Sequence, residues 1–425
     1  MSDSAGRETL AHRFRSLGHR NFRLYWVGQL LSLIGTWMQS VAQGWLMHRL
    51  TDSAFMLGLL GFVQFLPVLL LSLWAGVVAD RMDKRRLLYL TQGFALVQAA
   101  VLAAVVMTGT VRPWMVLGLA FVFGVINAFD LPVRQSFLVE LVGKEDLSNA
   151  IALNSAAFNT ARVIGPAIAG VLVATIGEGG CFGINAVSYL AVLYSLTLMR
   201  LPPRAGPADA AHRATLREGV AYARSVDSIR NLLVLLGVTA GLGFQFMILL
   251  PVYARSILHA GAGAYGLLVS AFGLGALLSV ARLTQNLDRW GLRRNLLIGL
   301  SSAGVGLGVF AWSRILPLSL IGGFMAGFGL IVYVASTNTL LQLTTEDRFR
   351  GRVMSLYTLM FVGTAPIGAL AAGAIAQRWG APIATSFSAV VLLGGALWVS
   401  YRLRVLAARE ESARHAEPAV VEKIG

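Results

Sequence analysis

The sequence has 425 residues, of which 56% are hydrophobic and only 13% are charged, and its formal net charge is +15. A soluble domain averages about 45–50% apolar and about 25% charged residues, so this composition excludes a water-soluble enzyme and indicates a chain solvated mainly by lipid. The single cysteine, Cys181, excludes an internal disulfide, and the six histidines show no metal-ligand spacing. We therefore expect no metal and no cofactor.

Runs of roughly 20 apolar residues, bounded by charge or by Gly and Pro turns, predict twelve membrane-spanning helices. Six are expected at 22–47, 55–79, 87–108, 114–133, 150–176 and 180–199, and six more at 231–254, 264–286, 294–313, 315–341, 353–376 and 381–402. Backbone groups in hydrocarbon must bond to one another, which favours helices over strands. The predicted fold class is an all-α membrane protein with two six-helix bundles related by pseudo-symmetry.

Polar stretches divide the chain into five parts. We predict an N-terminal tail at 1–21, a first bundle at 22–200, a central linker at 201–230, a second bundle at 231–403 and a C-terminal tail at 404–425. Most of the 35 Lys and Arg residues fall in the tails, the linker and the loops on one side. Cytoplasmic loops are enriched in these residues, so both termini and the linker are expected in the cytoplasm. The basic excess then reflects topology and not nucleic-acid binding.

The two halves of the sequence repeat each other. The stretch from Asp80 to Arg86 lies 208 residues before Asp288 to Arg294, and Gly58-Leu59-Leu60 lies the same distance before Gly266-Leu267-Leu268. Two bundles with the same internal order imply parallel repeats related by an axis along the membrane normal.

The stretch from Gly76 to Leu88 resembles the 2–3 loop signature of the major facilitator superfamily of transporters. It has the glycine, the spaced Asp-Arg pair and the paired basic residues, although Asp83 stands where the family usually has glycine. With the span count, the linker and the repeat, the resemblance covers nearly the whole chain. Within the superfamily, the runs 39–45 and 130–135 look like the branch containing the enterobactin exporter and macrolide-type drug efflux pumps. The resemblance implies a transporter that works as a monomer and rocks two bundles about a central polar cavity.

The resemblance also implies a gate at the cytoplasmic mouth. Its members would be charged residues at the ends of spans 2, 3, 4 and 11: Asp80, Arg81, Lys84, Arg85, Asp130 and Arg352. Asp80 would face Arg352, and Lys84 or Arg85 would reach Asp130, latching the bundles together. The alternative is that these are positive-inside charges at helix ends. Asp130 is also the first candidate proton carrier, because it is the carboxylate that approaches the membrane; Asp52 and His48 are the alternatives.

Span 5 contains Gly165, Pro166 and Gly170, which resemble the Gly-Pro motif of the family's exporters and antiporters. Small residues four apart let helices touch backbone to backbone. The motif is therefore expected to serve either in coupling or in helix packing alone.

Polar residues inside the spans predict a substrate cavity, since polar groups in lipid face protein or water. In span 1 they recur every three or four residues, on one helix face. Arg162 is expected about 18 Å into the bilayer, where it either meets an anionic group of the substrate or anchors a neighbouring helix. The candidate cavity residues are Thr36, Gln39, Gln43, Gln64, Arg162 and Gln245.

These features predict a secondary transporter in the bacterial inner membrane that exports a hydrophobic or amphipathic small molecule, such as a drug or siderophore, in exchange for protons. The expected partners are that molecule, protons and the lipid bilayer. Two alternatives stay open: cation-coupled uptake of a metabolite or lipid, and a membrane receptor or scaffold that transports nothing. No enzyme is expected, because the glycine-rich run 304–308 lies inside a span with no preceding strand.

Overall fold

The computed structural model describes residues 15–143, 145–200, 216–283 and 289–421. The first half contains η1 (Arg15–Gly18), α2 (Arg20–Thr51), α3 (Ala54–Arg81), α4 (Lys84–Met107), α5 (Pro113–Val142) and α6 (Leu147–Leu198). After α7 (Leu216–Ser225), the second half begins with α8 (Asp227–Gly243), η2 (Phe244–Leu249), α9 (Leu250–Val252) and η3 (Tyr253–Ile257). It continues with α10 (Ala262–Leu283), α11 (Arg289–Trp312), α12 (Leu316–Thr344), α13 (Asp347–Val362), α14 (Ala365–Trp379) and α15 (Ala381–Val421).

The all-α membrane fold is confirmed. Within the described residues, ten helical segments are long and apolar enough to cross a membrane. One of them, α6, holds two predicted spans, because Gly177 has non-helical angles (φ 75°, ψ 176°) that glycine adopts at little cost. Helix α2, which carries the polar stripe, is a further helix of 32 residues. These elements are consistent with twelve crossings.

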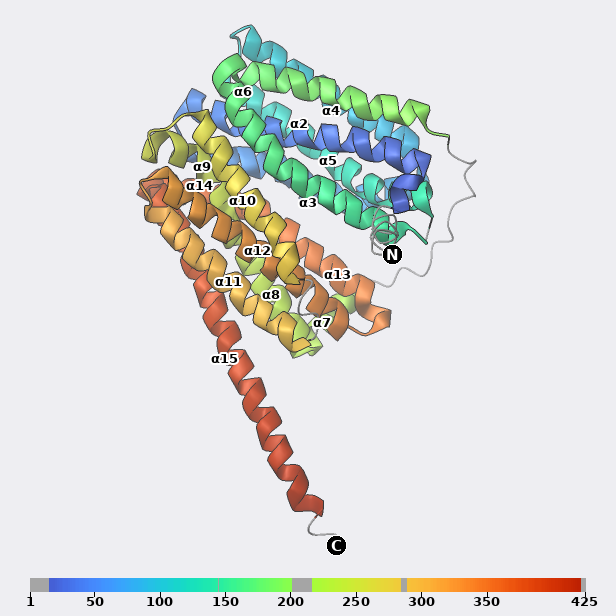
Figure 1. The fold of residues 1–425 in the computed structure, drawn as a ribbon, viewed down its shortest axis with the longest axis vertical. Coiled ribbons are helices and arrows are strands. Elements are labelled where there is room, and N and C mark those ends of the chain that lie inside the picture. Colours follow the sequence, from blue (N-terminus) through green and yellow to red (C-terminus); the bar gives the residue numbers. More distant parts are fainter. Residues whose placement is uncertain (1–14, 144, 201–215, 284–288, 422–425) are drawn as a thin grey trace, which may run out of the picture.

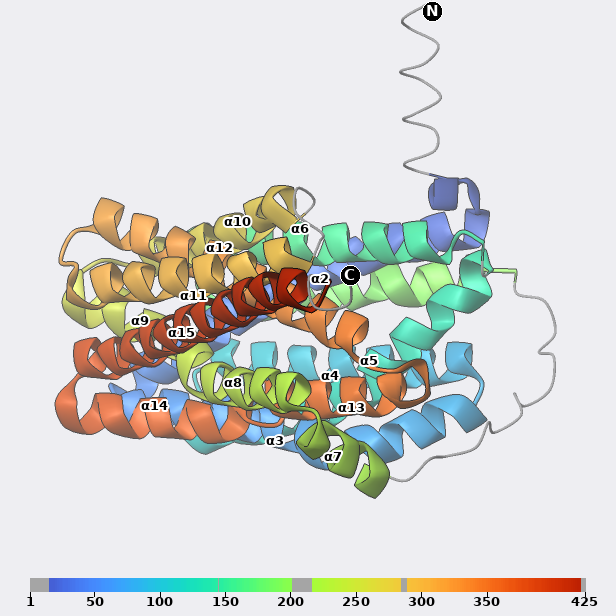
Figure 2. The same cartoon turned by 90° about the horizontal axis from the view of Figure 1, so that it is seen from below.

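Helices α2–α6 form one bundle and α8–α15 form the other (Figure 1). We call the end of the molecule that carries the start of α2, the α3–α4 turn and α7 the linker end, and the opposite end the far end. In Figure 1 the bundles approach each other at the far end, near α9 and α14, and diverge toward the linker end. Figure 2 shows α7 lying beside α13 at the edge of the second bundle.

The two bundles touch through helix pairs lined by small residues. A Cβ atom on Gly266 of α10 would lie 2.4 Å from the carbonyl oxygen of Pro166 and 2.9 Å from the Cα of Gly170, both in α6. At the other contact, a Cβ on Gly58 of α3 would lie 2.8 Å from the Cα of Gly373 in α14. Since Gly58 and Gly266 occupy matching positions in the repeat, the two contacts are pseudo-symmetric. The absence of side chains lets the backbones meet.

The halves differ in how their helices bend. Helix α6 continues through Pro166. In the second half, by contrast, the predicted span 11 is divided into α13 and α14 just before Pro366, and the predicted span 7 changes from α8 into the 3₁₀ segment η2 and the π segment η3. Broken helices of this kind are common at the binding sites of transporters.

Replacing Gly266 by Leu should prevent α6 and α10 from closing at the far end. Overpacking typically costs about 1–3 kcal/mol, and each 1.4 kcal/mol changes a population roughly tenfold, so the closed far end should become about tenfold rarer. Spin labels at Thr110→Cys and His259→Cys, in far-end loops of the two halves, should then move to longer distances. Gly118→Leu is the matched control, because nothing lies within 4 Å of a Cβ there; an unchanged distance in Gly266→Leu would contradict the packing role.

Candidate functional site

The polar stripe of α2 faces the interior of its own bundle. Gln39 is 2% exposed; its Nε2 donates to Oε1 of Gln98 in α4 at 3.1 Å, and its Oε1 accepts from Nδ2 of Asn185 in α6 at 2.8 Å. The Nε2 of Gln98 donates in turn to the carbonyl of Leu119 in α5 at 3.2 Å. In this conformation Gln39 and Gln98 together join four helices of the first bundle, and the hydrogen bonds of the Gln39 side chain are made inside that bundle.

The neighbouring candidates in the first bundle are also positioned by protein contacts. The Thr36 hydroxyl donates to the carbonyl of Ser32 at 2.8 Å and lies 3.3 Å from the Tyr189 hydroxyl. Gln43 is buried, and its Nε2 has no hydrogen-bond partner within the described part of the chain. Gln64 in α3 is half-buried. Of the candidates in α2, Gln43 is thus the one left with an unused buried donor.

Arg162 lies where the bundles meet. A Cβ on Gly273 of α10 would come within 2.8 Å of the Arg162 carbonyl oxygen, and the guanidinium carbon lies 5.5 Å from the centre of the Phe272 ring, also in α10. The side chain is 9% exposed. Among the described residues, its Nε and Nη2 atoms have no hydrogen-bond partner. A buried cation without a carboxylate or carbonyl partner is expensive, so Arg162 is the buried charge of this interface whose donors are left unused among the described residues.

In the second half, Gln245 lies in the 3₁₀ segment η2. Its Nε2 donates to the carbonyl of Ala240 in the last turn of α8 at 3.2 Å, where the change of helix type leaves a carbonyl without its usual partner. A Cβ on Gly368 of α14 would lie 2.8 Å from the Gln245 side chain. Gln245 therefore lies between the two broken helices of this half.

Asp130 is buried in a network within the first bundle. Its Oδ1 accepts from the Thr91 hydroxyl at 2.7 Å and from Nε2 of Gln92 at 2.8 Å. Its Oδ2 pairs with Arg134 one turn further along α5. The carboxylate is 4% exposed, and its contacts are three donors of the same bundle, one of them charged.

Lys84 and Arg85, two basic residues of the predicted gate, bind partners in their own half. Lys84 pairs with Glu140 of α5 at 2.7 Å, and Nη2 of Arg85 donates to the Thr197 carbonyl at 3.4 Å. In this conformation neither reaches Asp130. Arg81 is exposed, and the side chain of Asp80 lies outside the described side chains. Asp83, at the position where the family usually has glycine, caps α4 by accepting from the Arg86 amide at 2.7 Å.

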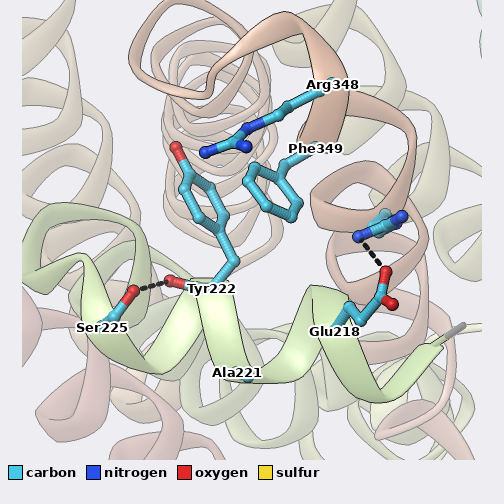
Figure 3. A pocket seen from close by; sticks show the side chains of 7 residues that line it. Glu218, Ala221, Tyr222, Ser225, Arg348 and Phe349 are labelled. Atoms are coloured by element: carbon cyan, nitrogen blue, oxygen red, sulfur yellow. Dashed lines mark hydrogen bonds and ion pairs between the residues drawn. The ribbon is translucent and has the colours of Figure 1, made fainter. Parts of the chain in front are cut away.

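Arg352, the gate candidate of the second half, is held by the linker helix α7. It pairs with Glu218 at 2.7 Å, and Tyr222 stacks on Phe349 with 4.0 Å between ring centres (Figure 3). These residues line a cavity of about 590 Å³ between α7 and α13. Glu218 was not a candidate from the sequence, where the helix around it is interpreted mainly as a connection between the bundles, with a regulatory role as the alternative.

The far end is closed by polar contacts between the two halves. His48 at the end of α2 is 2% exposed, and its Nε2 lies 3.3 Å from the Ser256 hydroxyl of η3. Arg255 donates to the His48 carbonyl at 3.4 Å, and the Ser53 hydroxyl donates to Oε1 of Gln377 at 3.0 Å. Sequence reasoning did not select Ser256 or Gln377, because isolated polar residues at helix ends carry no motif.

Replacing Gln39 by Leu should lower stability, because Asn185 and Gln98 would each lose a buried partner. An unsatisfied buried polar group costs about 1–3 kcal/mol, so thermal melting of the purified protein should begin several degrees earlier. Ser40→Ala is the control, since Ser40 is exposed beside it. Unchanged melting with lost transport would instead place Gln39 on the substrate.

Comparison with known proteins agrees with this architecture. A family model described as transmembrane secretion effector matches residues 11–424. The staphyloferrin A transporter of Staphylococcus aureus is 27% identical over 365 residues, which cover 84% of this chain and 90% of that protein. The multidrug efflux pump Tap of Mycolicibacterium fortuitum is 24% identical and covers 81% and 87% of the two chains. The enterobactin exporter EntS of Citrobacter koseri is 27% identical and covers 84% and 85%.

Solved structures share the fold. A bacterial homologue of the human lysosomal transporter Spinster, in an inward-facing and occupied conformation, gives a TM-score of 0.71 at 14% identity and covers 91% of this chain and 97% of that one. The nucleoside transporter NupG gives 0.68 at 13% identity, with 90% and 98% covered. Because the family model spans almost the entire sequence, the chain belongs to the transmembrane secretion effector family of major facilitator transporters.

Proposed function

We propose that this transporter exports an anionic amphipathic small molecule in exchange for protons. The observation that carries the proposal is Arg162, a guanidinium that is nine-tenths buried between the bundles with two nitrogens unpartnered among the described residues. An anionic group on the substrate supplies the missing acceptors. The Phe272 ring beside it provides an apolar surface for the rest of an amphipathic molecule.

The relatives support this substrate class. Their names include a staphyloferrin A transporter, enterobactin exporters and a multidrug efflux pump, so both siderophores and drugs are handled by proteins of this kind. Among these, an anionic siderophore fits the unpaired Arg162 better than a cationic drug does, because a second cation would be repelled.

In the proposed orientation the linker end lies in the cytoplasm, as its excess of Lys and Arg favours, and both termini are cytoplasmic. The conformation closed at the far end is then inward-facing. When the linker end closes, Arg352 leaves Glu218 and pairs with Asp80, and the Gly170 and Gly266 contact opens. Gly165 and Pro166 take part by keeping α6 closely packed.

Asp130 is the proposed proton carrier. Protonation removes the charge that holds Arg134, Thr91 and Gln92 together, and the network can then rearrange with the bundles. This proposal makes proton binding and conformational change the same event, as antiport requires.

The direction of transport and its coupling can be tested in everted membrane vesicles. An imposed pH gradient, acid inside, should drive an anionic amphipathic dye into vesicles that contain the protein, and an uncoupler should abolish the accumulation. Accumulation under the opposite gradient would indicate uptake, and no movement in either direction would indicate a receptor or scaffold.

Arg162→Ala should lower the initial rate of transport of the anionic dye about tenfold or more, because a charged contact is lost. Transport of the uncharged methyl ester of the dye should be unchanged. Paired initial rates for the acid and the ester measure the difference. Equal loss for both probes would show that Arg162 has a structural role instead.

Asp130→Asn should abolish proton-driven accumulation and retain exchange of labelled for unlabelled dye in the absence of a gradient. Because the change leaves Arg134 buried without its carboxylate, which is destabilising, the double variant Asp130→Asn/Arg134→Gln should recover folding but not coupling. Glu178→Gln is the control: Glu178 is also buried and paired, with Arg49 at 2.7 Å, and its loss should leave coupling intact. Accumulation by Asp130→Asn would exclude Asp130 as the carrier.

A further inference from the structure

A second cavity opens at the linker end of the second bundle, between α8, α11, α12 and α15. Its volume is about 210 Å³, more than ten times what one water molecule needs. Leucines and Val399 form its apolar wall, and its polar lining consists of Ser228, Asn231, Thr344, Arg293 and Arg402. The site thus combines hydrogen-bond donors with a surface for hydrocarbon.

The two arginines bring charge that the described residues do not neutralise. The guanidinium of Arg293 lies 5.4 Å from the centre of the Trp290 ring, and that of Arg402 lies 5.9 Å from the Trp398 ring. Neither guanidinium forms a hydrogen bond or an ion pair with the described side chains and backbone up to residue 405. The carboxylate at the start of α8, Asp227, is bound to Arg230.

In the first bundle, the arginine that matches Arg293 binds a backbone carbonyl at the end of a helix. Arg85 lies 208 residues before Arg293, at the matching position of the repeat. Helix α6 ends at Leu198, and the carbonyls of its last turn are left without intrahelical partners. Arg85 donates to the Thr197 carbonyl at 3.4 Å, and Arg20 donates to the Leu198 carbonyl at 3.0 Å.

Among the described residues of the second bundle, the matching helix offers no such acceptor at this level. Helix α15 does not end where α6 does but continues to Val421, so its carbonyls near Val399 are used within the helix. Arg293 and Arg402 therefore keep donors that the described residues do not occupy.

We infer that this cavity binds the phosphate of an anionic phospholipid from the leaflet at the linker end. Arginine donates two parallel hydrogen bonds to a phosphate, and basic pockets between transmembrane helices take anionic headgroups. Trp290 and Trp398 are 43% and 38% exposed, as is typical of aromatic residues at the membrane surface. The headgroup lies between the arginines, and the acyl chains follow the apolar wall out to the bilayer.

The binding is tested with the full-length protein in uncharged detergent. Dihexanoyl phosphatidylglycerol should raise the melting temperature in a saturable way, whereas dihexanoyl phosphatidylcholine should not. The variant Arg293→Gln/Arg402→Gln should bind phosphatidylglycerol roughly tenfold more weakly or worse, because it loses two charged contacts. Native mass spectrometry of the same samples counts the bound lipid.

Matched controls separate this site from general surface charge. Arg294→Gln/Arg404→Gln removes two exposed arginines next to the site and should leave the affinity unchanged. Arg293→Lys/Arg402→Lys keeps the charges and should retain binding within a few fold, even if the glutamine variant folds poorly. Equal weakening in both glutamine variants would overturn the inference. A matching stabilisation by inorganic phosphate would identify a soluble anion as the ligand and would also overturn it. None of these outcomes depends on the transported substrate.

Discussion

Contact between bare backbones is the constraint on which the rest of this structure depends. In lipid the hydrophobic effect does not drive helices together, so close van der Waals packing has to supply the free energy of association. Gly266 against Pro166 and Gly170, and Gly58 against Gly373, bring the halves within van der Waals distance at two pseudo-symmetric places. Such contacts are strong only while the surfaces match, and they can part without breaking a covalent or ionic bond. An interface of this kind suits two bundles that move relative to each other.

The buried polar groups fall into two classes once that interface is in place. Gln39 and Asp130 are satisfied inside the first bundle by neighbouring helices. Arg162, by contrast, has buried donors that the described residues leave unused. Groups of the first class hold a bundle together, because an unsatisfied polar group in a low dielectric is costly. Groups of the second class are where a ligand gains most, since binding removes a cost that the protein already carries.

The linker helix α7 contacts Arg352, a residue of the proposed cytoplasmic gate. Glu218 of α7 holds Arg352 at the start of α13, so the proposed gate cation already has a partner while the linker end is open. Glu218 is exposed and Arg352 half-buried in this pair, and ion pairs open to solvent contribute only about 0–1 kcal/mol. In the proposed transport cycle, the linker therefore acts on the balance between conformations.

The sequence by itself determined the helical membrane fold, the repeat and the family. The length of each hydrophobic run and the placement of charges are local properties, and they decide which segments the bilayer accommodates and in which orientation. It also singled out Arg162, since a cation in the middle of an apolar run is unusual in any context. Only the tertiary structure decided that Gln39 meets Gln98 and Asn185, that Arg352 meets Glu218, and that Arg293 lacks the acceptor available to Arg85. The spacing along one helix shows which residues share a face, but not which neighbour covers that face. That depends on how distant helices pack and on where each of them ends.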